Sequence, residues 1–386
     1  MRLFSLFLLL FSAPVLAQTP APLIPSPPTL AAKAWVLLDW QTRQVLVSRN
    51  PDERVEPASL TKLMTAYLVF DALKQKRIAP EQTIPVSERA WKADGSRMFI
   101  EPRKPVTADE LIKGMVVQSG NDATIALAEA VGGSEEAFAD LMNKQAARMG
   151  LTGSHFVNST GLPDPQHYST ARDLGVLAAD VIRDFPEYYH YFAELTFVHN
   201  GIEQGNRNPL LYRNMGVDGL KTGHLTVSGY GLAASALRNG RRVVVVAHGM
   251  ESMQARADEV AKLIEWAYRE FDNYKLAAAG DVLENAPVWL GEAETVPMVL
   301  GADLVVTLPR GKRETLEARA VLANAVPAPI AAGQPIGMLI VTMPGMAPLE
   351  RPLLAGADVA ELGMFGRVMA AIRSLLFSDE TEAVGA

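Results

Sequence analysis

Ser59-Leu60-Thr61-Lys62 places a hydroxyl and an amine three residues apart. On a helix, residues at this spacing lie on one face, so both side chains can reach the same cavity. A lysine that loses its charge there can accept the proton of the serine hydroxyl and turn the serine into a nucleophile. Alone, the tetrapeptide is more typical of an ordinary capped helix, so the prediction depends on the other motifs in the chain.

Ser119-Gly120-Asn121 offers a second hydroxyl and an amide. The hydroxyl can relay a proton to a leaving amine, and the amide can bond a substrate carbonyl or the lysine. As an isolated tripeptide, this segment equally fits a loop with a helix cap.

Lys221-Thr222-Gly223 stands at the start of a predicted strand that is followed by a hairpin. Lys221 can orient an anionic group and Thr222 can bond a carboxylate. Gly223 leaves room for a peptide to lie alongside the strand edge. The alternative is a strand edge with a lysine in solvent.

The elements that must position these residues are indicated by hydrophobic periodicity and turn signals. Helices are predicted where apolar residues recur every three or four positions, and Thr107 with Glu110 resembles a capping box. Asn239-Gly240 is a strong hairpin signal. The predicted strands cover residues 34–39, 45–48, 229–237 and 241–248, and the predicted helices cover residues 59–74, 107–117, 122–131 and 256–271.

Composition excludes several classes of function. The net charge of −7 gives no attraction to nucleic acid. The chain has no cysteine, and none of its six histidines has a partner three or four residues away, so neither a metal site nor a cofactor is expected.

The N-terminus has the pattern of an export signal: Arg2, an apolar run, and the small-residue site Val15-Leu16-Ala17. Residues 1–17 are therefore predicted to be a signal peptide, cleaved after Ala17. The alternative, an uncleaved anchor, is disfavoured because the apolar run is too short for a bilayer core of about 30 Å. Residues 18–30, which are rich in proline, are predicted to form an extended, poorly packed linker.

Past Gly280 the sequence changes to short β-like runs separated by Gly and Pro turns, which predicts a small β-sandwich or barrel. A final helix is predicted to carry one apolar face, formed by Leu362, Phe365, Val368, Met369, Ile372, Leu375 and Leu376. Its position after the last domain favours an interfacial membrane anchor over a helix packed on the β domain.

The motifs at 59–62, 119–121 and 221–223 are called the first, second and third boxes below. In order, these three boxes match the Ser-x-x-Lys, Ser-x-Asn and Lys-Thr-Gly set of penicillin-binding proteins and serine β-lactamases. The chain resembles the low-molecular-mass D-alanyl-D-alanine carboxypeptidases of the penicillin-binding protein 5/6 type. The segments that carry the resemblance are 57–62, 118–123, 168–173 and 217–224.

The resemblance implies an α/β (α+β) penicillin-recognising serine transferase fold. Its antiparallel sheet is flanked by helices and has a helical subdomain, and a small all-β domain and a terminal amphipathic helix follow. The implied boundaries are 31–274 for the catalytic domain, 275–353 for the β domain and 358–377 for the membrane-anchor helix. The protein would be exported and would lie at the periplasmic face of the bacterial inner membrane.

The implied reaction is a two-step hydrolysis of peptidoglycan pentapeptide stems. Ser59 attacks the carbonyl between two D-alanines, D-alanine leaves, and water releases the acyl-enzyme. Lys62 is expected to be the general base, with Ser119 and Asn121 in the proton path and Lys221 orienting both. β-Lactam antibiotics would acylate the same serine.

Substrate recognition is assigned by the same resemblance. The backbone N–H groups of Ser59 and His224 would form the oxyanion hole, which can supply about 3–4 kcal/mol per donor. Thr222 is the first choice for the terminal carboxylate. Arg207 and Arg256 lie where the resembling enzymes have active-site arginines, and each fits a surface or packing residue equally well.

Two other functions are disfavoured by the sequence. A class A β-lactamase would need a Glu-x-x-x-Asn pattern between the second and third boxes, and no glutamate between Asn121 and Lys221 has asparagine four residues later. A non-catalytic wall-binding protein would have no need of an activated nucleophile, so the intact Ser59, Lys62 and Lys221 argue against it.

Overall fold

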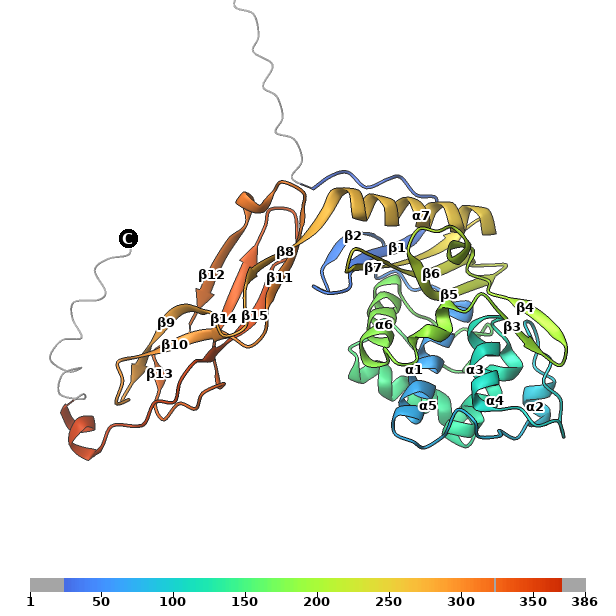
Figure 1. The fold of residues 1–386 in the computed structure, drawn as a ribbon, viewed down its shortest axis with the longest axis horizontal. Coiled ribbons are helices and arrows are strands. Elements are labelled where there is room, and N and C mark those ends of the chain that lie inside the picture. The colour runs from blue at the N-terminus through green and yellow to red at the C-terminus, as the bar shows by residue number, and fades with distance from the viewer. Residues whose placement is uncertain (1–23, 323, 370–386) are drawn as a thin grey trace, which may run out of the picture.

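The computed structural model describes residues 24–322 and 324–369. Figure 1 shows two regions that meet where a long helix ends and the next strand begins: a mixed region of sheet and helices, and an elongated all-β region. The predicted signal peptide lies outside the described residues, as do the first part of the linker and the end of the terminal helix.

The mixed region is built on a five-stranded antiparallel sheet in the order β2-β1-β7-β6-β5. Asn239 and Gly240 join β6 to β7 with positive φ angles, as the predicted hairpin turn requires. The order leaves β5, which carries the third sequence box, at one edge. The strands are β1 (Ala34–Asp39), β2 (Val45–Arg49), β5 (Val217–Leu225), β6 (Gly229–Arg238) and β7 (Arg241–Met250).

Alternation along the strands divides the core into two layers. Val36 and Leu38 of β1 face a cluster with α1 (Lys62–Lys74) and α6 (Ala171–Asp184), whereas Leu37 faces α7 (Met253–Glu270). The run from Val243 to Ala247 is buried throughout, because helices cover both faces of the sheet.

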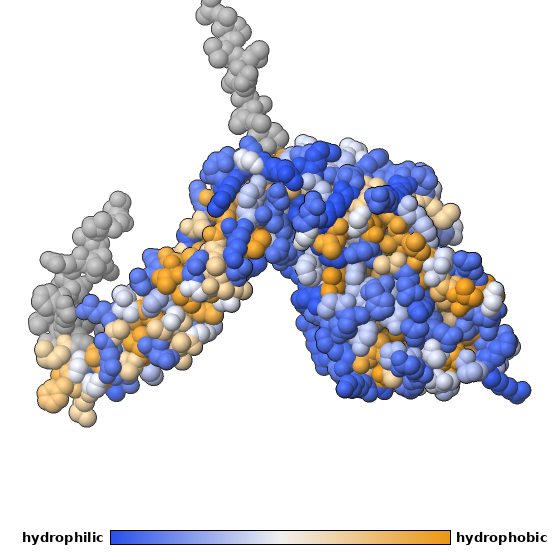
Figure 2. All heavy atoms as spheres, viewed as in Figure 1, coloured by the Kyte–Doolittle hydropathy of each residue, from blue (hydrophilic) through white to orange (hydrophobic). Residues whose placement is uncertain are grey.

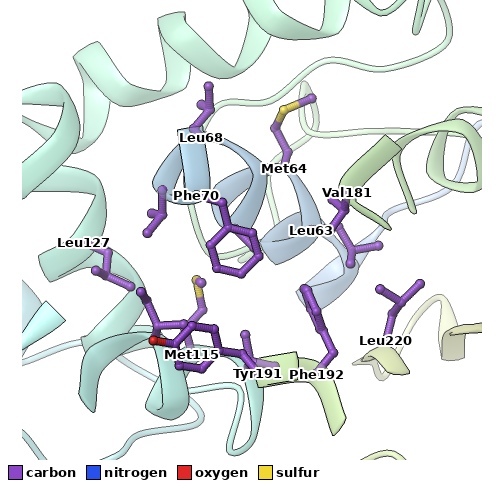
Figure 3. Packing of buried hydrophobic residues seen from close by; sticks show 14 of the residues in the cluster. Leu63, Met64, Leu68, Phe70, Met115, Leu127, Val181, Tyr191, Phe192 and Leu220 are labelled. Carbon is purple, nitrogen blue, oxygen red and sulfur yellow. The ribbon is translucent and has the colours of Figure 1, made fainter. Parts of the chain in front are cut away.

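A helical subdomain packs around α1. Figure 3 shows Phe70 of α1 enclosed by apolar side chains that include Leu127, Met115 and Phe192. Removing a fully buried ring such as this one typically costs about 3–5 kcal/mol, so the position of α1 is strongly fixed. The other helices here are α2 (Glu88–Trp91), α3 (Ala108–Val116), α4 (Asn121–Gly132) and α5 (Glu135–Arg148), with the 3-10 helix η2 (Tyr189–Ala193) and the hairpin β3 (Thr196–His199) and β4 (Ile202–Gly205).

The predicted capping box is confirmed, whereas α1 and α7 start at other residues than predicted. Thr107 and Glu110 form a reciprocal capping box at the start of α3. Gly133 ends α4 in the left-handed conformation, with φ of 84°.

The all-β region contains a six-stranded sheet in the order β12-β14-β15-β10-β9-β13 and a two-stranded layer of β11 and β8. The predicted boundary between residues 274 and 275 falls inside β8, which pairs with β11 from its first residue. The strands are β8 (Phe271–Ala277), β9 (Val282–Trp289), β10 (Thr295–Leu300), β11 (Leu304–Pro309), β12 (Glu317–Val321), β13 (Val326–Pro327), β14 (Pro335–Thr342) and β15 (Leu349–Ala355).

The two regions are tied together by buried polar contacts. Thr42, in the turn after β1, hydrogen-bonds Thr307 of β11 at 2.7 Å, and the Thr307 backbone N–H donates to Gln44 at 2.7 Å. Because these groups are withdrawn from water, losing one partner would leave the other unsatisfied.

The linker corrects one expectation. Within the part of it that is described, the chain is extended but packs along α7 instead of standing free (Figure 1). Leu30 is buried, and the Trp266 indole N–H donates to the Ser26 carbonyl at 3.1 Å. A buried indole N–H needs an acceptor, and this segment supplies it.

The predicted terminal helix begins later than expected: residues 358–363 are not helical, because Val359 and Glu361 form β-bridges to the all-β region, and of the described residues only 364–369 are helical. Phe365 is 90% exposed there, and Met364, Val368 and Met369 are also exposed. In Figure 2 this end of the β region carries hydrophobic residues on its surface. Among the residues described, no helix has the length and apolar character needed to cross a bilayer.

Candidate active site

Ser59 lies in a 3-10 turn, η1 (Ala58–Thr61), and the α-helix starts three residues later than predicted, at Lys62. Ala58, directly before the serine, has a φ of 50°, a conformation that non-glycine residues rarely adopt. The side chains of Ser59 and Lys62 still meet as their spacing predicted, with Lys62 Nζ 3.1 Å from Ser59 Oγ.

Lys62 is only 1% exposed, and its amine has three oxygen neighbours. Besides Ser59 Oγ, Nζ lies 2.7 Å from Asn121 Oδ1 and 2.7 Å from the Thr160 carbonyl oxygen. Burial, with a smaller effect of the nearby Arg207 charge, lowers the pKa of Lys62 to about 7. The amine is therefore available as a base near neutral pH.

The second box sits where α4 begins. Ser119 has a φ of 64° and a buried Oγ without a hydrogen-bond partner among the described residues. Asn121 uses both ends of its amide: Oδ1 accepts from Lys62, and Nδ2 donates to the Asp94 carbonyl at 2.6 Å. A strained, unsatisfied hydroxyl facing a cavity is typical of a site that awaits a ligand.

The third box lies on the edge strand β5. Lys221 is buried, and its Nζ donates to the Thr222 carbonyl at 3.1 Å. Burial lowers the pKa of Lys221 well below its usual value, and the charges of Lys62, Arg207 and Arg256 act in the same direction. Lys221 thus lies close to three other basic side chains at this edge of the sheet.

Gly223 allows β5 to approach the turn that carries Ser59. A Cβ atom on Gly223 would stand 2.9 Å from the Pro57 carbonyl oxygen, closer than real Cβ contacts. The missing side chain thus serves the packing of residues 57–58 against β5, a role beyond the room for a peptide that was expected.

The two arginines and His224 form the outer part of the site. His224 is exposed and stacks on Tyr230 with ring centroids 4.0 Å apart. Arg256, on α7, is 5% exposed, and its guanidinium lies over the same Tyr230 ring, 5.6 Å from the ring centre. Its Nε has no partner in the described part of the chain, and burial lowers the pKa of Arg256 to about 10. Arg207 is exposed at the same cavity.

These residues surround a cavity of about 480 Å³. Of the predicted residues, Lys62 and Lys221 stand behind the wall of the cavity, where they contact Ser59 and the Thr222 carbonyl. The others line it directly: Ser59, Ser119, Asn121, Arg207, Thr222, Gly223, His224 and Arg256. The structure therefore brings all the predicted site residues to one place.

Sequence reasoning missed part of the wall. Gly95, Ser96, Gly161, Leu162, Leu225, Tyr230 and Met253 also line the cavity, together with Ala58 and Thr160. Thr160 matters most, because its backbone carbonyl binds Lys62, and a backbone contact leaves no signal in residue types. His167, outside the cavity lining, hydrogen-bonds Thr61 at 2.8 Å, and burial lowers its pKa to about 4.

Comparison with known protein families gives two matches that together span most of the chain. A family model described as D-alanyl-D-alanine carboxypeptidase, peptidase S11, matches residues 21–252. A second, described as penicillin-binding protein 5, C-terminal domain, matches residues 271–361.

Individual relatives agree. The D-alanyl-D-alanine carboxypeptidase DacA of Haemophilus influenzae is 38% identical over 349 residues, 89% of each chain. DacC of Escherichia coli is 39% identical over 349 residues, 88% of this chain and 87% of its own.

Solved structures show the same fold. Penicillin-binding protein 5 from Haemophilus influenzae superposes with a TM-score of 0.82 at 38% identity, covering 87% of this chain and 99% of its own. Penicillin-binding protein D2 from Listeria monocytogenes in its ampicillin-bound form matches with a TM-score of 0.58 at 28% identity, covering 62% of this chain and 98% of its own.

Proposed function

Because the chain belongs to the D-alanyl-D-alanine carboxypeptidase family, we propose that Ser59 is the nucleophile with which this carboxypeptidase removes the terminal D-alanine of peptidoglycan pentapeptides. The observation that carries the assignment is the contact of 3.1 Å between Ser59 Oγ and the amine of Lys62, a lysine buried beside the cavity. The neighbouring backbone is strained on both sides of this contact, at Ala58 and Ser119.

The first step is acylation. Neutral Lys62 takes the proton of the Ser59 hydroxyl as Oγ attacks the carbonyl between the two D-alanines. The oxyanion that forms accepts hydrogen bonds from the Ser59 and His224 backbone N–H groups, as the resemblance implies. Ser119, whose hydroxyl is unpaired among the described residues, gives its proton to the departing amine and takes the proton held by Lys62, so that the C–N bond breaks, D-alanine leaves and Lys62 is neutral again.

The second step is deacylation. Water attacks the Ser59 ester and gives a proton to Lys62; Lys62 then returns the proton to Ser59 Oγ as the ester C–O bond breaks, so the shortened peptide leaves and the serine hydroxyl is restored. β-Lactams acylate the same serine and leave slowly, because no glutamate is arranged to activate water as in class A β-lactamases.

The free carboxylate of the terminal D-alanine defines an exopeptidase and needs a cationic or hydroxyl partner. Thr222 supplies a hydroxyl on β5, and Arg256 supplies a guanidinium whose Nε is unpaired among the described residues. Arg207 stands at the same cavity and adds a second positive charge. We assign the carboxylate to Thr222 and Arg256, with Arg207 contributing through its charge.

The experiment that tests this function uses the protein without residues 1–17. Wild type should release D-alanine from a peptide that ends in D-Ala-D-Ala and should take up a labelled penicillin. Ser59→Ala should do neither. Uptake of label by Ser59→Ala, or no release of D-alanine by wild type, would refute the assignment.

Location is part of the proposal. Residues 1–17 direct export, and the exposed apolar side chains of residues 364–369 begin a helix that holds the enzyme on the periplasmic face of the inner membrane. Deleting the residues after Ala360 should move the protein from the membrane fraction to the soluble fraction. If the longer protein is already soluble, the anchor assignment fails.

A further inference from the structure

Glu135 is a buried carboxylate outside the three sequence boxes. It opens α5 and is 4% exposed, although glutamate is almost never buried without partners. Oε1 accepts hydrogen bonds from the Ser159 backbone N–H at 3.1 Å and from Ser159 Oγ at 2.7 Å. Oε2 accepts from the Arg89 guanidinium. Four hydrogen bonds thus compensate the charge of Glu135, and two of them come from Ser159, in the segment beside Lys62.

That segment, residues 158–162, is held from several directions. Thr65 of α1 donates to the Ser159 carbonyl at 2.6 Å, so Ser159 is fixed on both sides. Asn158 Oδ1 accepts from the backbone N–H groups of Thr160 and Gly161, at 3.2 and 2.7 Å. With its neighbours fixed, the Thr160 carbonyl has one direction available, toward Lys62 Nζ at 2.7 Å.

The direction of this carbonyl decides what Lys62 can do. A neutral amine has two hydrogens and one lone pair. If Asn121 Oδ1 and the Thr160 carbonyl take the two hydrogens, the lone pair remains for the Ser59 proton. If the Thr160 carbonyl turns away, an N–H is free to point at Ser59 Oγ, which opposes proton abstraction.

We propose that Glu135 is a positioning residue for acylation: through Ser159 it fixes the Thr160 carbonyl and thereby aims the Lys62 lone pair at Ser59. The proposal rests on the assignment of Ser59 and Lys62 made above. It gives a role to a side chain that touches neither the cavity nor the substrate.

The charge of Glu135 adds a measurable signature. Glu135 and Asp122 favour the protonated form of Lys62, whereas Arg207 opposes it. The titratable groups that face Lys62 are Asp122 on α4, Glu135 on α5, Lys221 on β5, and Arg207 and His167 in loops. Removing the negative charge at residue 135 therefore lowers the pKa of Lys62.

The test compares three variants by their acylation rate with a fluorescent penicillin from about pH 5 to 9, a range that brackets the base. Glu135→Gln keeps an acceptor for Ser159 and loses the charge, so its acid limb should move to lower pH while the plateau rate stays within about threefold of wild type. Glu135→Ala loses the acceptor as well as the charge, so its acid limb should move in the same direction and its plateau rate should be about 100-fold lower, as a small misplacement of a catalytic group can cause.

Glu136→Gln is the matched control. Glu136 also pairs with Arg89, at 3.1 Å, and lies on the same turn, but it is exposed and does not contact residues 158–162. It should behave as wild type. Thermal unfolding of each variant gives the folded fraction at the assay temperature.

Two results would overturn the proposal: a wild-type rate in Glu135→Ala after correction for folded protein, or an equal loss in Glu136→Gln. Either result leaves the nucleophile untouched. Labelling of Ser59→Ala in the same assay would instead refute the assignment of Ser59, so the two failures are distinguishable.

Discussion

Gly161 lies directly against Ala58, the residue before the nucleophile. A Cβ atom on Gly161 would stand 1.8 Å from the Ala58 carbonyl oxygen and 2.7 Å from Thr61 Oγ1. The segment that supplies the Thr160 carbonyl to Lys62 therefore also packs against η1, the turn that contains Ser59. One loop fixes both partners of the reacting pair.

Gly161→Ala should destabilise the protein and abolish acylation. Gly161 has a φ of 81°, so a side chain is strained there even without the clash, and the Ala58 backbone must move to make room. We expect a loss of unfolding free energy of about 3 kcal/mol or more, since backbone strain and a steric clash combine. Urea denaturation and penicillin labelling measure the two effects.

Gly133→Ala is the control for that substitution. Gly133 has a similar φ of 84°, but a Cβ atom there meets nothing within 4 Å. It should cost about 1 kcal/mol from the backbone alone and leave labelling unchanged. Equal losses in the two variants would show that the contact with Ala58 is unimportant.

Lys62→Arg should remove catalysis while the protein stays folded. A guanidinium is not deprotonated in proteins, so it cannot accept the Ser59 proton. We expect acylation to slow by about 10²- to 10⁴-fold, the usual contribution of a general base. Stopped-flow labelling with a fluorescent penicillin measures it, and a near-normal rate would exclude Lys62 as the base.

The pH dependence of acylation should reflect Lys62. Its pKa is about 7, and the neutral form is the active one, so the rate should fall as pH drops below 7. Arg207 lowers this pKa, so Arg207→Gln should raise it and move the acid limb to higher pH. A limb that stays in place, or moves to lower pH, would contradict the assignment.

Much of the fold could be predicted from the sequence because its signals are local. Capping at Thr107 and the hairpin at Asn239-Gly240 depend on neighbouring residues, and both are confirmed. The family and fold implied by the three boxes are confirmed as well. The start of α1 was misplaced by three residues, because a 3-10 turn and an α-helix have nearly the same apolar spacing.

The rest depends on contacts that no local pattern encodes. The Thr160 carbonyl is 98 residues from Lys62, and as a backbone group it carries no residue identity. Glu135 is 24 residues from Ser159, and nothing in the sequence places the two side by side. The proline content of the linker predicts an extended chain. It does not predict what that chain packs against, so the contact with Trp266 on α7 was not foreseen.

Arg256→Ala should weaken recognition of the substrate's free carboxylate while leaving the nucleophile intact. The guanidinium lines the cavity on α7 and is held over Tyr230, away from Ser59 and Lys62 in the chain and without a hydrogen bond to either. Loss of a charge-assisted hydrogen bond should cost about 1.5–3 kcal/mol, or roughly 10- to 100-fold in kcat/KM for a peptide ending in D-Ala-D-Ala. A peptide with an amidated C-terminus has no carboxylate to lose, so wild type and variant should cleave it at the same low rate.

Arg213→Ala is the control, because Arg213 pairs with Asp258, which lies on the same helix as Arg256, and does not line the cavity. If Arg256→Ala slows both peptides equally, Arg256 acts through packing, and the carboxylate is bound by Thr222 or Arg207 instead.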